Sequence, residues 1–234
     1  MGKKTIFFDL DDTLYDRAVP YQEAFSTFFG GRYAEKAAQA FDTVIHRGYE
    51  VFAAAHTGQM TMDAMHIYRH QQGLRDVGIE ITAAQALEFQ ALYAGRQRKI
   101  SLTETMRRVL DVCSARFAAI GVLTNGGVQS QQDKLASLGM ERWAKPELIL
   151  ISDALGVMKP GPEIFHLAER AAGCGPEALV YVGDSLTQDV AGAGGCGWET
   201  VWLNRRGERT DGIRPDWTVD SEAALLAWAE GQGA

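Results

Sequence analysis

The chain of 234 residues has few cysteines, no long apolar run and no excess of positive charge. Its cysteines, Cys113, Cys174 and Cys196, are odd in number and lack the spacing of a metal site. They are therefore predicted to be small buried hydrophobes in a reducing compartment. No stretch is apolar for long enough to span a bilayer, and residues 1–4 run directly into a first strand. We expect a cytoplasmic protein without a signal peptide and without a membrane partner.

The charge balance limits the partners of the chain. A net charge of −7 argues against nucleic-acid polymers and acidic membranes, because both favour a basic face. A small anionic substrate stays possible, since a few local cations can hold it. A hydrophobic fraction of 46% is sufficient for a sizeable core, in one large domain or in a domain with an insert. We expect a monomer or a homodimer.

An acidic stretch at the N-terminus dominates the pattern. Asp9, Asp11 and Asp12 directly follow the apolar run of residues 6–8, which is typical of a buried parallel strand. The carboxyl end of such a strand is where ligands bind in open α/β sheets. Because each carboxylate raises the pKa of its neighbour, the cluster is costly unless a divalent cation relieves it. The stretch alone is equally compatible with a magnesium-type site and with a solvated acidic turn.

The rest of the chain divides into two parts with different patterns. Residues 17–98 predict helices and no strand, and from about residue 103 onwards helices alternate with short apolar runs. The predicted helices are 21–29, 33–55, 62–74, 83–98, 103–115, 129–138, 162–172, one starting near 189, and 220–230. The predicted strands are 5–9, 118–123, 148–151, 179–182 and 200–203.

This alternation predicts an α/β fold, in which a Rossmann-like parallel sheet carries helices on both faces. The core domain would comprise residues 1–16 and 99–234. The helical block 17–98 would be an inserted cap domain, because it follows the carboxyl end of the first strand.

Polar side chains lie at the carboxyl ends of the predicted strands or in the segments that follow these strands. They are Asp9, Asp11, Thr124, Asn125, Lys159, Asp184, Ser185 and Asp189. The carboxyl ends of parallel strands share one edge of a sheet, so these groups can converge. A carboxylate can attack phosphorus, and a second one can move protons. Hydroxyl and amide groups can hold phosphate oxygens, a lysine can neutralise charge, and the acids can hold a cation. The inventory fits phosphoryl transfer.

These motifs resemble, in order and spacing, those of the haloacid dehalogenase (HAD) superfamily. The matching motifs are residues 9–14 (DLDDTL), 123–126 (LTNG), 159–160 (KP) and 183–185 (GDS) with Asp189. The helical insert is similar to the four-helix type 1 cap of that superfamily, and the resemblance covers essentially the whole chain. One departure is the segment 100–103, which lacks the proline usual where the chain returns from the cap.

The resemblance implies a role for each motif residue. Asp9 would be the nucleophile and a Mg²⁺ ligand, and Asp11 would be the general acid and base and offer its backbone carbonyl to the metal. Thr124 and Asn125 would bind the phosphoryl group, and Lys159 would stabilise Asp9 and the phosphoryl oxygens. The remaining implied roles are metal ligation by Asp184 and support by Asp189 and Ser185. Tyr15 follows the nucleophile loop, and this position is equally compatible with contact to the substrate and with no such role.

Because Asp11 is present, the resemblance implies a magnesium-dependent phosphatase acting on a small phosphorylated metabolite, and not a dehalogenase. Residues 202–205, 215–219 and 57–61 are most similar to the bacterial pyrimidine 5′-nucleotidase branch, which implies a pyrimidine nucleoside 5′-monophosphate. Phosphoglycolate and sugar-phosphate phosphatases share part of this pattern. A sugar-phosphate mutase and a non-catalytic binding protein are further alternatives. Within the predicted cap, His66 and His70 lie four residues apart, which suits either one metal or, more commonly, a partly exposed helix face.

Overall fold

The computed structural model describes residues 2–232, which form two compact units. The first unit combines the N-terminal segment up to Tyr15 with the chain from Ser101 onwards, and the second unit is Asp16–Ile100. The predicted cap domain, residues 17–98, falls inside the second unit, and its boundaries remain a proposal. No helix within residues 2–232 is long and apolar enough to cross a membrane.

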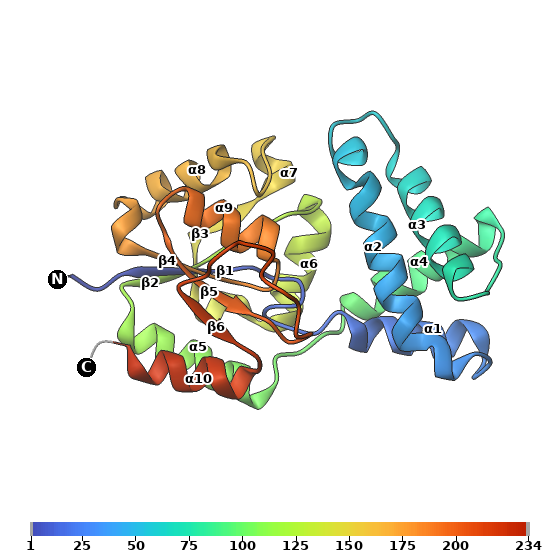
Figure 1. Cartoon of the computed structure of the whole chain (residues 1–234), viewed down its shortest axis with the longest axis horizontal. Coiled ribbons are helices and arrows are strands. Elements are labelled where there is room, and N and C mark those ends of the chain that lie inside the picture. Colours follow the sequence, from blue (N-terminus) through green and yellow to red (C-terminus); the bar gives the residue numbers. More distant parts are fainter. Residues whose placement is uncertain (1, 233–234) are drawn as a thin grey trace. The chain divides into compact units, whose positions relative to one another are not determined.

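The first unit is built on a six-stranded sheet with the strand order β3-β2-β1-β4-β5-β6 (Figure 1). All of its neighbouring strands are parallel, so the predicted α/β fold is confirmed. The strands are β1 (Thr5–Phe8), β2 (Ala119–Thr124), β3 (Ala144–Ile151), β4 (Leu179–Gly183), β5 (Glu199–Leu203) and β6 (Trp217–Val219). The sequence did not predict β6, because this three-residue edge strand exposes Trp217 and Thr218 and so has no apolar run.

Helices cover both faces of this sheet. Figure 1 shows α8 (Pro162–Ala172) and α9 (Ala191–Gly195) on one face and α5 (Glu104–Arg116) and α10 (Glu222–Gly231) on the other. The unit also contains α6 (Val128–Leu138) and the short α7 (Ser152–Leu155). The helix predicted near residue 189 begins as a π-helical turn, Leu186–Val190, which leads into α9.

The second unit consists of α1 (Ala18–Phe29), α2 (Ala37–His56), α3 (Met62–Asp76) and α4 (Ala83–Gln97), with a 3₁₀ turn before α2. Threonine residues cap two of these helices. The Thr61 side chain accepts a hydrogen bond from the Ala64 backbone N–H, and Thr82 forms a full capping box with Gln85.

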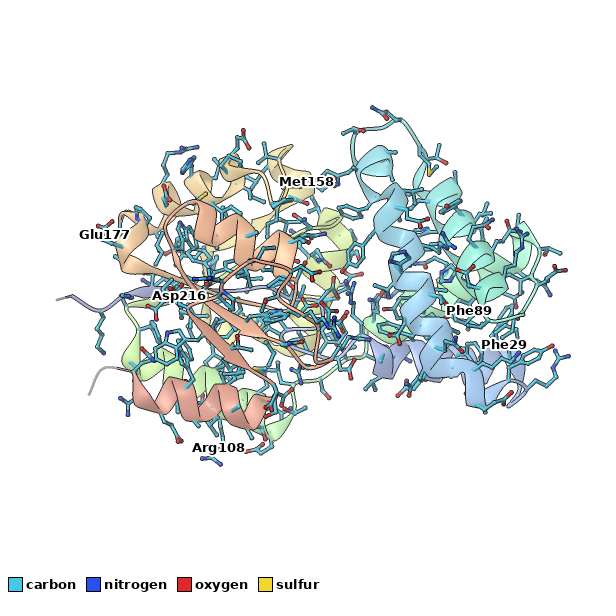
Figure 2. The ribbon with its side chains drawn as sticks, in the orientation of Figure 1. Phe29, Phe89, Arg108, Met158, Glu177 and Asp216 are labelled. Carbon is cyan, nitrogen blue, oxygen red and sulfur yellow. The ribbon has the colours of Figure 1, made fainter. Side chains whose placement is uncertain are left out.

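The interior of the second unit is rich in aromatic side chains. The ring of Tyr21 lies 5.3 Å from those of Phe41 and Phe89, and Phe29 lies 6.3 Å from Phe89 (Phe29 and Phe89 are labelled in Figure 2). Such tilted and edge-to-face pairs stabilise the unit beyond the contribution of the area that the rings bury. Packing of these rings therefore holds α1, α2 and α4 together.

Candidate active site

Parallel pairing brings the polar residues of the first unit to one edge of its sheet. Phe8 at the end of β1 pairs with Val122 of β2 and with Val182 of β4. The next residue, Asp9, donates its backbone N–H to the Val182 carbonyl oxygen at 2.8 Å. The residues that follow these strands therefore meet at the carboxyl edge, where open α/β sheets bind ligands.

Lys159 lies at the centre of this edge. Its Nζ is 2.7 Å from Asp9 Oδ1, from Asp189 Oδ1 and from the Tyr181 hydroxyl, and the residue is 2% exposed. Burial opposes the charged form of Lys159, but the carboxylates of Asp189 and Asp9 hold its pKa well above its usual value. Lys159 is therefore a fixed cation between two carboxylates.

The Asp9 carboxyl is subject to opposing influences. Its pKa is raised to about 7: burial raises it most, Lys159 lowers it, and the neighbouring charges of Asp189 and Asp11 raise it. Asp9 is 6% exposed, so water does little to stabilise its charge. A second cation beside it would favour the carboxylate form.

Three carboxylates offer a place for such a cation. Oxygen atoms of Asp9, Asp184 and Asp189 all lie within 4.8 Å of one another. A donor set made only of carboxylate oxygens suits a hard cation such as Mg²⁺. Gly183 makes this approach possible, because a Cβ at that position would lie 2.3 Å from Asp189 Oδ2. The residues present therefore fit a magnesium ion.

Asp11 points to a different set of partners. Lys134 Nζ lies 2.8 Å from both of its carboxylate oxygens, and the Tyr15 hydroxyl donates to Oδ1 at 2.5 Å. Gln131 Nε2 lies 3.3 Å from Oδ2. The Asp11 carboxylate thus accepts hydrogen bonds on both oxygens and is not part of the acidic cluster.

The other predicted residues also lie at this edge, each with protein partners. The Thr124 hydroxyl accepts from Gln131 at 2.8 Å. Asn125 joins the loop of Lys159 through two hydrogen bonds, from its Nδ2 to the Lys159 carbonyl and from the Lys159 N–H to its Oδ1, both 2.9 Å. Ser185 caps the π-helical turn by accepting from the Gln188 N–H, and its own N–H donates to Asp189. The structure therefore brings all eight predicted core residues and Tyr15 together.

Sequence reasoning missed four residues at this edge: Gln131, Lys134, Tyr181 and Gln188. One signal could have indicated two of them. Gln131 and Lys134 are three residues apart on α6 and share its buried face with Leu135 and Leu138. Polar residues on an otherwise apolar helix face indicate buried partners. Tyr181 lies in an apolar strand, where an aromatic residue gives no such signal.

Comparison with known proteins places these features in a family. Residues 3–197 match the family described as haloacid dehalogenase-like hydrolase. Glyceraldehyde 3-phosphate phosphatase of Methanopyrus kandleri is 39% identical over 113 residues, which are 46% of this chain and 47% of that protein. Pyrimidine 5′-nucleotidase YjjG of Escherichia coli is 38% identical over 106 residues, 44% of this chain and 46% of that protein. The chain thus spans about half the length of these relatives.

The fold is also found in a solved structure. The HAD hydrolase YfnB of Bacillus subtilis, crystallised with magnesium, superposes with a TM-score of 0.76 at 23% identity, over 98% of this chain and 99% of that one. At this identity the likeness concerns the fold alone. The family match over 195 residues (3–197) establishes that the chain belongs to the haloacid dehalogenase-like hydrolase family.

Proposed function

We propose that the protein is a magnesium-dependent phosphatase that hydrolyses a small phosphate monoester through an aspartyl phosphate on Asp9. The observation that carries this proposal is the contact of Lys159 with Asp9 beside the acidic cluster of Asp9, Asp184 and Asp189. A nucleophilic carboxylate, a buried cation and an oxygen site for a metal are what phosphoryl transfer requires.

The two chemical steps follow from the residues at the edge. An Asp9 carboxylate oxygen attacks phosphorus while the bond from phosphorus to the ester oxygen breaks, and Asp11 gives that oxygen a proton. The Asp11 carboxylate then takes a proton from water, whose oxygen attacks phosphorus and releases phosphate from Asp9. Thr124 and Asn125 would bind phosphoryl oxygens, and Lys159 would stabilise their charge.

The metal site completes this arrangement. Asp9, Asp184 and the backbone carbonyl of Asp11 would hold Mg²⁺, with Asp189 and Ser185 supporting them. When bound, the ion supplies positive charge that offsets the charge on the phosphoryl oxygens and on the Asp9 carboxylate. Tyr15 would contact the substrate.

The preferred substrate class is a pyrimidine nucleoside 5′-monophosphate. The similarity to a pyrimidine 5′-nucleotidase and the motifs at 202–205 and 215–219 support this choice. A second candidate is a small sugar phosphate, because another relative is a glyceraldehyde 3-phosphate phosphatase. Both classes are dianionic monoesters and would use the same residues at the sheet edge, so the choice between them depends on the leaving group.

Dehalogenation, which gave the family its name, fits these residues less well. A halide ion leaves without a proton, so it needs no general acid beside the nucleophile. Asp11 stands two residues after Asp9, where a carboxylic acid can protonate the ester oxygen that leaves in phosphate ester hydrolysis.

The test is phosphate release from a panel of pyrimidine and purine nucleoside 5′-monophosphates, sugar phosphates and phosphoglycolate, with Mg²⁺ or with a chelator. We expect hydrolysis that needs Mg²⁺ and falls at least about 10³-fold in Asp9→Asn, because the nucleophile is lost. A haloacid added to the same panel would test halide release. Mg²⁺-independent hydrolysis, or hydrolysis that survives in Asp9→Asn, would refute the proposal.

A further inference from the structure

Lys134 is a buried lysine that the proposed chemistry does not account for. It lies on α6, is 5% exposed and shares the buried helix face of Gln131, Leu135 and Leu138. An ammonium group that is removed from water is costly unless it is paired and hydrogen-bonded. Its partner is Asp11, whose two carboxylate oxygens both lie 2.8 Å from Nζ.

Two further donors fix the same carboxylate. Tyr15 donates its hydroxyl to Oδ1, and Gln131 Nε2 approaches Oδ2. Gln131 Nε2 also lies 2.8 Å from the Thr124 hydroxyl and 2.9 Å from the Asn125 carbonyl oxygen. Helix α6 therefore sets the position of Asp11 relative to the residues that follow β2.

The geometry leaves Asp11 only as an acceptor. Both of its oxygens receive a hydrogen bond from the Lys134 ammonium, and Oδ2 also receives one from the Gln131 amide. Neither group can accept a hydrogen bond in return, because an ammonium and an amide N–H₂ are donors only. A carboxylate held in this way is oriented for the step in which it takes a proton from water. In the step that donates a proton to the ester oxygen, the same pairing gives no advantage.

We propose that Lys134 is a positioning residue that orients Asp11 as the base for hydrolysis of the aspartyl phosphate. This inference rests on the proposed function and adds a residue to it. Lys134 acts through Asp11 and does not itself touch the reacting atoms. Its loss should slow the second chemical step more than the first.

Lys134→Met tests this division, with p-nitrophenyl phosphate as substrate, because nitrophenolate leaves without being protonated. We expect kcat to fall about tenfold to a hundredfold, within the range of general base catalysis, while kcat/KM changes by less than about threefold. KM should therefore fall together with kcat. A burst of nitrophenolate and a phosphorylated enzyme, detected by intact mass after acid quench, should accompany the change.

Two comparisons separate positioning from mere support of the fold. The exposed lysine of β3 provides the control Lys145→Met, which should leave all of these quantities unchanged. In an Asp11→Asn background, Lys134→Met should have no further effect on kcat, because it acts through Asp11. An equal fall of kcat and kcat/KM, or an undiminished effect without Asp11, would overturn the proposal. If Lys134→Met does not fold, Lys134→Arg, which keeps the charge, replaces it. The phosphoenzyme of Lys134→Arg should then decay more slowly than that of the wild type.

A structural measurement keeps the two proposals distinguishable. If the wild-type protein turns over no phosphate ester, the proposed function fails. A crystal structure of Lys134→Met then still decides the role of Lys134: an Asp11 carboxylate that turns away supports positioning, and one that stays in place refutes it.

Discussion

The two units of this chain bury different kinds of polar group. In the first unit, Asp9, Lys159 and Asp189 lie within a few ångströms of one another and are almost inaccessible to water. In the second unit, His70 is fully buried, its ring packs against that of Phe89, and its Nε2 lies 2.8 Å from Gln90 Oε1. The first unit therefore buries charged side chains, whereas the second buries the neutral imidazole ring of His70.

The same physical cause produces both results. Burial disfavours the charged form, and it is the main reason that the pKa of Asp9 is raised to about 7 and that of His66 is lowered to about 4. Near Asp9, Lys159 opposes the effect of burial; near the two histidines, the charge of Arg69 reinforces it. A buried side chain in this protein thus keeps its charge where a buried partner of opposite sign lies beside it. The proposed chemistry needs such charged side chains, so it belongs to the site of Asp9 and Lys159.

The largest expected effect comes from breaking the charge cluster. Lys159→Met leaves Asp9 and Asp189 without their common cation, which should lower the free energy of unfolding by about 3–5 kcal/mol and reduce kcat at least about 10²-fold. In the second unit, Arg47→Met removes exposed ion pairs with Asp76 and Glu50 and should change stability far less. Urea unfolding and phosphate release measure both variants. Equal destabilisation would remove the distinction between the units.

Magnesium should stabilise the first unit next most strongly. At a concentration 100 times its Kd, the ion should add about 2.7 kcal/mol and raise the melting temperature by several degrees. Asp184→Asn should abolish this rise, because it removes one of the three clustered carboxylates. The control Glu88→Gln changes an exposed acid of the second unit and should keep the full rise. Differential scanning calorimetry with Mg²⁺ and with chelator measures the melting temperature of each variant. If Mg²⁺ raises the melting temperature of Asp184→Asn as much as that of the wild type, this cluster is not the metal site.

Packing, and not charge, should govern the second unit. Gly73→Ala places a Cβ 2.6 Å from the Val44 backbone, where α2 and α3 approach closely, and should destabilise by about 1–3 kcal/mol. Gly95→Ala on α4 meets no atom within 4 Å and should stabilise by about 0.5–1 kcal/mol. Thermal unfolding followed by circular dichroism compares them. A tolerated Gly73→Ala would show that the two helices can separate at little cost.

The remaining effect concerns pH. Burial holds the pKa of His70 well below 6.5 and that of His66 at about 4. Between pH 6.5 and 4, the unfolded chain therefore binds more protons at these histidines than the folded chain does. Stability should therefore fall as pH falls below about 6.5, by at most about 1.4 kcal/mol per pH unit for each such histidine.

His70→Gln tests this sign, because it keeps an Nε2 donor for Gln90 and removes one titrating group. We expect a shallower loss of melting temperature between pH 6.5 and 5 than in the wild type. His46→Gln, which changes an exposed histidine of α2, is the control and should follow the wild-type curve. Identical curves for His70→Gln and the wild type would mean that the buried ring does not carry the pH dependence.

Much of the fold and of the candidate site could be predicted from local patterns. The apolar run before Asp9 and the periodic spacing in residues 17–98 indicated the strand and the helices, because each pattern is set by the residues of one element. The sequence pattern did not predict the edge strand β6, because two of its three residues are exposed. His70 on α3 was taken for a partly exposed helix position, yet it is fully buried, because a helix pattern does not show what packs against it.

The sequence by itself determined the α/β alternation, the helical insert and the residues Asp9, Thr124, Lys159 and Asp184 at the ends of strands and in the following loops. It could do so because parallel strands place their carboxyl ends on one edge whatever the details of packing. Only the tertiary structure decided that Lys159 joins Asp9 to Asp189 and that Lys134, 123 residues further along the chain, holds Asp11. Such pairs depend on how helices pack against a sheet, and no local pattern of residues specifies that contact.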